Sequence, residues 1–125
     1  MKKLISMLLV LALVMTMSVS AMAISTPSPQ TKTNTRNGYT YSCTASANIS
    51  SASGSMTYGD SKATISAGVN LKLERRSDGT ESSASDADNG RSSVSVYYSN
   101  TAYRITKASF GFAVGNYSVF TPIFD

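Results

Sequence analysis

The longest regular pattern of the chain lies near its middle. From Ala63 to Leu73, apolar residues occupy every second position, and small or polar residues occupy the positions between them. Successive side chains of a β-strand point to opposite faces of a sheet, so this spacing produces one apolar face and one polar face. A helix would scatter the same apolar residues around its circumference. The pattern therefore predicts a long central β-strand. We expect Ile65, Val69 and Leu71 to lie in the core and to contact some of Phe110, Phe112 and Val114.

A second alternation runs from Tyr39 to Ile49, with apolar residues on one face and Ser, Thr or Asn on the other. Shorter strands are predicted over 56–58 and 91–98, with 50–55 as a connection. A change of phase near Lys107 predicts a β-bulge or two short strands. Asp78-Gly79 and Gly115-Asn116 are turn signals. About six or seven short strands separated by turns predict an all-β fold, an antiparallel sandwich or a partly open barrel. We expect the aromatic C-terminal hairpin to form the layer that covers the two Ala-rich strands.

The first 23 residues have the three parts of a signal peptide. Lys2 and Lys3 precede an apolar run over 4–19, and Ala21-Met22-Ala23 matches a cleavage site. An uncleaved membrane anchor is the alternative, but the run is shorter than a membrane span and no basic cluster follows it. We therefore expect cleavage after Ala23, secretion of the remaining chain, and no stable membrane span after cleavage.

The mature chain is expected to begin with a leader and to continue as one domain. Residues 24–38 are rich in Ser, Thr and Pro and poor in apolar residues, which predicts a disordered segment. Residues 39–125 carry all the strand patterns and predict a single small sandwich domain. The only cysteine, Cys43, falls on the apolar side of its strand. We expect it to be buried, with pairing between two chains as the alternative.

Composition excludes several chemistries. The chain contains no His, which removes the usual triads of serine and cysteine hydrolases and the commonest zinc ligand. No phosphate-binding glycine loop is present, and no cofactor is expected. Loss of Lys2 and Lys3 would lower the net charge from +4 to +2. That charge is too small, and too little clustered, to indicate nucleic-acid binding.

Acidic residues gather in one loop, which is a candidate site. Asp78, Glu81, Asp86 and Asp88 are the only charged residues between Ser77 and Gly90. Carboxylates in a Ser-rich loop can hold Ca²⁺, but the spacing does not fit a calcium loop and the terminal bidentate Glu is missing. We therefore favour a soluble hairpin in which these acids protect an edge strand.

Two further groups of residues are candidates for function. Glu74 and Glu81 flank a predicted hairpin turn and could face each other as the two carboxylates of a glycosidase, although solvated charges are the simpler interpretation. Tyr58, Tyr97 and Tyr103 could form an aromatic surface for a sugar or a protein partner, although Tyr also favours strands for structural reasons.

These observations predict a secreted, non-enzymatic binding module whose partner is an extracellular protein or a carbohydrate. A secreted, bacteriocin-like antagonistic protein is the alternative, because a signal peptide followed by a short, weakly basic β-domain is compatible with both. The ligand and the oligomeric state do not follow from the residues.

Overall fold

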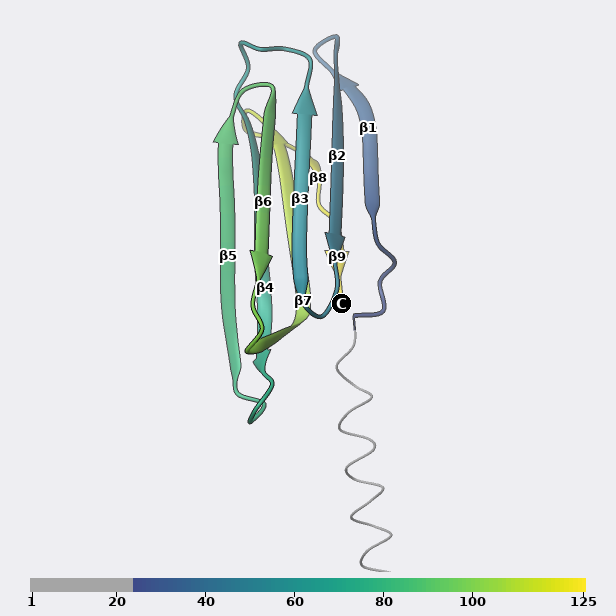
Figure 1. The fold of residues 1–125 in the computed structure, drawn as a ribbon. Coiled ribbons are helices and arrows are strands. Elements are labelled where there is room, and N and C mark those ends of the chain that lie inside the picture. The colour runs from purple at the N-terminus through teal and green to yellow at the C-terminus, as the bar shows by residue number, and fades with distance from the viewer. Residues whose placement is uncertain (1–23) are drawn as a thin grey trace, which may run out of the picture.

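The structure is a computed structural model, and it describes residues 24–125 (Figure 1). These residues form nine strands and no helix. The expected signal peptide and its cleavage site lie outside the described residues. Over 24–125, no helix has the length and the apolar character that a membrane crossing requires. The strands are β1 (Gln30–Arg36), β2 (Tyr39–Ala47), β3 (Ser51–Tyr58), β4 (Ile65–Arg75), β5 (Glu81–Gly90), β6 (Ser93–Ser99), β7 (Tyr103–Val114), β8 (Tyr117–Phe120) and β9 (Ile123–Phe124).

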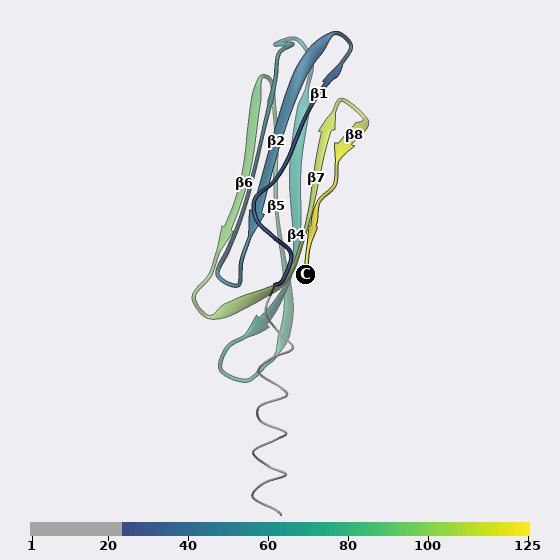
Figure 2. The same ribbon diagram turned by 90° about the vertical axis from the view of Figure 1, so that its right-hand side faces the viewer.

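The strands form two antiparallel sheets that pack face to face. One sheet has the order β1-β2-β3-β6, and the other has the order β5-β4-β7-β8, with β9 also paired to β7. Figure 2 shows the two sheets as separate layers. The predicted all-β sandwich is therefore confirmed. The strand number was underestimated, and the sheets do not close into a barrel because each has two open edges.

Strand β4 has the predicted register. Leu71 and Leu73 are buried whereas Lys72 between them is exposed. Val69 lies opposite Phe110 on the neighbouring strand β7, and Ile65 lies opposite Val114. One expectation was wrong: β7 is not the layer that covers β4 but its neighbour in the same sheet. Paired residues of adjacent strands point to the same face, so β4 and β7 together present one apolar surface to the other sheet.

The aromatic rings of β7 pack against the opposing sheet at Gly54. A Cβ atom at Gly54 would lie 3.0 Å from two ring atoms of Phe110 and 3.1 Å from Phe112 Cζ. The rings of Phe110 and Phe112 stack in parallel, and Phe124 meets Phe110 edge to face. The aromatic residues therefore fill the space that Gly54 leaves in the opposing sheet. The sequence led us to expect them to fill space beside the Ala-rich segments 39–49 and 63–73, and of these only β2 lies in the opposing sheet.

Residues 30–36 correct the expectation of a disordered leader. They form β1, which pairs with β2 through its whole length, and Asn37 and Gly38 adopt positive φ in the hairpin turn between them. The amide groups of Ser25 and Thr26 donate to the Asp125 carbonyl oxygen. Strand β1 was missed because it buries little apolar surface; backbone hydrogen bonds, which every non-proline residue can form, hold it in place.

Two local predictions had opposite outcomes. The β-bulge near Lys107 is present, since Lys72 pairs with Lys107 and Leu73 pairs with Ile105, which leaves Thr106 without a partner position. The connection predicted over 50–55 was wrong, because β3 already begins at Ser51. The residues of this segment are small and mostly polar, but Ala52 and Gly54 alternate inward with Met56.

Cys43 is buried, as predicted, and this leads to an expected pH effect. Burial raises the pKa of the thiol from its ordinary value of 9.0 to about 11, although Lys32 opposes part of the rise. Between these values the unfolded chain releases a proton that the folded chain retains, so stability falls as pH rises through this window. The slope is about 1.4 kcal/mol per pH unit. Chemical denaturation on both sides of pH 9.0 should show this loss in the native protein and not in Cys43→Ala. Equal slopes in both proteins would contradict it.

Candidate functional site

The three tyrosines predicted as a surface do not lie together. Tyr58 is buried, and its hydroxyl donates to the Arg36 carbonyl oxygen at 2.7 Å. Tyr103 is half-buried and accepts a hydrogen bond from Arg75 Nη2 at 3.3 Å. Tyr97 is 63% exposed and is the only one of the three with a free aromatic face. Tyr39 and Tyr117 are also exposed but were not among the predicted residues.

The acidic residues separate into different roles. Asp78 accepts a hydrogen bond from the Thr80 amide at 3.0 Å and pairs with Arg75 at 3.2 Å. The hydrogen bonds from Thr80, together with the nearby charge of Arg75, hold the pKa of Asp78 below its usual range. Asp86 and Asp88 lie on β5 and point toward β6 instead. Within 24–125, no three His, Cys, Asp or Glu residues converge as metal ligands do.

Asp86 and Asp88 connect the free edges of the two sheets. The Asp88 carboxylate accepts a hydrogen bond from the Ser95 amide at 3.0 Å, and the Asp86 carboxylate accepts one from the Tyr97 amide at 2.9 Å. Strand β6 is the last strand of its sheet, so these amides would otherwise be open to pairing with another chain. The two carboxylates thus protect an edge strand, by hydrogen bonding directly to its backbone.

Glu74 and Glu81 face each other across β4 and β5, as predicted. Glu74 is only 8% exposed, and its Oε1 lies 3.9 Å from Arg104 Nε on the other neighbouring strand. Both carboxylate residues line a hollow of about 640 Å³ that Lys72 and Thr106 also line. The hairpin therefore brings two carboxylates to one surface hollow.

The outer surface of the β1-β2-β3-β6 sheet has a uniform chemistry. Every outward-facing residue of its four strands is Ser or Thr, with Tyr97 as the single exception. The opposite sheet differs, because Lys72, Glu81 and Lys107 occur on its strands away from the core. We call the uncharged surface the hydroxyl face. It consists of Thr31, Thr33, Thr35, Thr40, Ser42, Thr44, Ser46, Ser51, Ser53, Ser55, Thr57, Ser93, Ser95, Tyr97 and Ser99.

Strand pairing arranges these hydroxyl groups in rows. Thr44 lies opposite Ser55, which lies opposite Ser95, and Ser53 stands between Ser46 and Tyr97 in the next row. Neighbouring strands of a sheet are about 4.8 Å apart, and every second residue along a strand is about 6.8 Å from the last. The hydroxyl face is therefore a regular grid of groups that both donate and accept hydrogen bonds.

Part of this face could be read from the sequence. The alternation over 39–49 already placed Thr40, Ser42 and Thr44 on a polar side. Only strand order showed that the polar sides of four strands adjoin, including β1, which was expected to be disordered.

No protein-family model matches the chain, and neither the curated proteins nor the solved structures contain a match. The proposed function therefore depends on the geometry of the described residues.

Proposed function

We propose that this protein is a secreted, non-enzymatic binding module and that its hydroxyl face contacts a neutral polysaccharide. The observation that supports this proposal is the composition of that face, which contains hydroxyl groups and one exposed aromatic ring but no charged side chain.

The chemistry of the face matches that of sugar chains. Ser and Thr hydroxyls donate one hydrogen bond and accept two, so a grid of them can pair with the repeated hydroxyls of a glycan in either direction. Tyr97 offers an exposed ring beside Ser53, on which the apolar side of a sugar can stack. A partner with many charges would find no counterpart on this face.

A depletion assay with insoluble polysaccharides tests the proposal. The mature protein should be removed from solution by at least one of cellulose, chitin or mannan. Ser55→Glu places a charge at the centre of the hydroxyl face and should weaken binding by about tenfold, which is about 1.4 kcal/mol. Asn70→Glu is the matched control, because Asn70 is an exposed position on β4 in the other sheet. Tyr97→Ala should weaken binding without changing the fold.

Two results would contradict the proposal. In the first, none of the polysaccharides removes the protein. In the second, Ser55→Glu and Asn70→Glu bind equally well. Killing of related cells by a mature protein that binds no glycan would instead favour the antagonistic protein.

A hydrolase is the second candidate, and the hollow that holds Glu74 and Glu81 is the observation that favours it. Directly opposite residues have Cβ atoms about 5 Å apart, so the two Glu side chains are close enough for their carboxylates to approach the separation used by retaining glycosidases. Release of reducing ends from any of the same polysaccharides, and its loss in Glu81→Gln, would establish this activity. A protein that binds polysaccharide without releasing reducing ends would rule it out for these substrates.

A further inference from the structure

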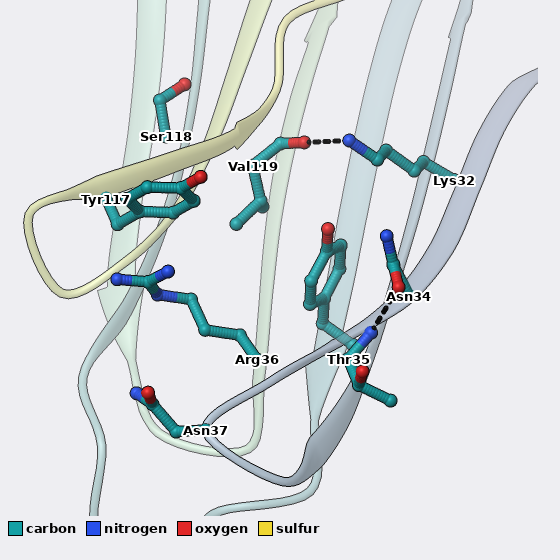
Figure 3. A pocket seen from close by; sticks show the side chains of 9 residues that line it. Lys32, Asn34, Thr35, Arg36, Asn37, Tyr117, Ser118 and Val119 are labelled. Atoms are coloured by element: carbon teal, nitrogen blue, oxygen red, sulfur yellow. Dashed lines mark hydrogen bonds between the residues drawn. The ribbon is translucent and has the colours of Figure 1, made fainter.

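A cleft lies on the side of the sandwich where the edge strands β1 and β8 face each other (Figure 3). Its volume is about 370 Å³, within the range of small-ligand pockets. Lys32, Asn34 and Arg36 line it from alternate positions of β1, and Tyr117 and Ser118 line it from β8. We call this space the β1–β8 cleft.

The cleft carries positive charge without an acidic counterpart. No Asp or Glu lines it, and neither Lys32 nor Arg36 forms an ion pair within residues 24–125. The Lys32 ammonium donates to the Val119 carbonyl oxygen at 2.8 Å, which joins the two sheets and fixes the charge in the cleft. An ammonium has three donors, so two remain for a ligand.

Arg36 is held in a different way. Its guanidinium carbon lies 3.5 Å from the centre of the Tyr117 ring, and Figure 3 shows the group stacked beneath that ring. Stacking occupies one face of the planar guanidinium and leaves its N–H groups at the edge, where they can pair with an oxyanion in a bidentate manner. Tyr117 is 54% exposed, so the arrangement is reachable from solvent.

The spacing of these groups favours an extended ligand. Lys32 and Arg36 are four residues apart on one strand, so their Cα atoms are about 13 Å apart, with Asn34 between them. Two cationic side chains that start from Cα atoms this far apart suit a chain with repeated oxyanion groups better than one small ion. The neutral groups of Asn34, Asn37 and Ser118 suit sugar hydroxyls between those oxyanions.

We propose that the β1–β8 cleft binds an acidic polysaccharide through the carboxylates of its uronic acid units. Lys32 and Arg36 each hold one carboxylate, and Asn34 and Ser118 contact the sugar between them. This site is separate from the hydroxyl face, so it extends the proposed function without depending on it.

Titration of the mature protein with oligogalacturonate tests this site. Calorimetry should show saturable binding, and amide chemical shifts should change mainly at residues of β1 and β8. Arg36→Gln should weaken binding about tenfold, and Arg36→Lys should have an intermediate effect because it keeps the charge but loses the planar fork. Lys62→Gln is the matched control, since it removes one positive charge from an exposed loop position outside the cleft.

Several outcomes would overturn the proposal. One is an equal loss of affinity in Arg36→Gln and Lys62→Gln, which would indicate unspecific charge attraction. Another is tighter binding of polyphosphate than of oligogalacturonate, which would assign the cleft to phosphate chains. A third is the absence of saturable binding. Ser55→Glu should leave oligogalacturonate affinity unchanged, so failure here and failure of the hydroxyl-face proposal can be told apart.

Discussion

Replacement of Phe110 by alanine is expected to lower the free energy of unfolding by about 3–5 kcal/mol. The side chain is 3% exposed and packs against Phe112 and Phe124, with ring centres 6.3 Å and 5.6 Å away. Its removal takes apolar surface out of the core and leaves a cavity that paired strands on both sides prevent from collapsing. Urea denaturation followed by far-ultraviolet circular dichroism measures the loss.

The contact between Gly54 and Phe110 can be tested with single and double variants. Gly54→Ala alone should destabilise the fold by about 1–3 kcal/mol, because its new methyl group would lie 3.0 Å from the Phe110 ring. In the double variant with Phe110→Ala, the same methyl enters the vacated space, so the combined loss should be smaller than the sum. Gly111→Ala is the control, since nothing lies within 4 Å of its Cβ position. Additive losses would show that Gly54 and Phe110 do not meet as described.

Removal of both edge carboxylates, in Asp86→Ala with Asp88→Ala, should destabilise the protein by about 2–4 kcal/mol and promote self-association. The Ser95 and Tyr97 amides would lose their acceptors, and β6 would present an open edge to other chains. Denaturation measures the first effect. Sedimentation velocity at increasing protein concentration measures the second.

The effect of charge on self-association can be separated from the effect of the hydrogen bonds that protect the edge of β6. The double Asp→Asn variant keeps an oxygen acceptor at both positions, so it should associate less than the double Asp→Ala variant although its charge is the same. Glu81→Gln removes a charge from an exposed residue of the same strand and should associate no more than the native chain. Both double variants are more positive than the native chain, which opposes association by repulsion. A double Asp→Ala variant that is as stable as the native chain and associates no more than it does would contradict the role assigned to these residues.

The strands that were predicted correctly bury apolar side chains at every second position. Strand β3 has the same pattern, but its first half was missed because the inward residues there are only Ala52 and Gly54. From Tyr41 to Ala47 and from Ile65 to Leu73, every second side chain is buried because one face of each strand enters the core. The phase change near Lys107 revealed a bulge for the same reason, since an extra residue shifts the apolar set to the other side. The sequence of β1 has no alternation of apolar and polar residues, because its side chains are mostly exposed.

The candidate surfaces were less predictable than the strands. The sequence identified Tyr97 and the acidic residues as candidates. It did not show that the Tyr97 amide donates a hydrogen bond to the Asp86 carboxylate. The β1–β8 cleft joins Lys32 to Val119, which lie far apart in the chain. No local sequence pattern predicts a contact of this kind, because the contact depends on which strands lie at the edges of the sheets.

The sequence by itself determined the fold class, the register of the long strand and the burial of Cys43, since each follows from the period of apolar residues along one segment. The tertiary structure alone decided strand order. That order placed β7 beside β4 instead of across from it, brought the polar faces of four strands together, and set β1 opposite β8. The physical reason is that alternation specifies which side of a strand is buried, whereas the choice of neighbour depends on packing between residues distant in the chain.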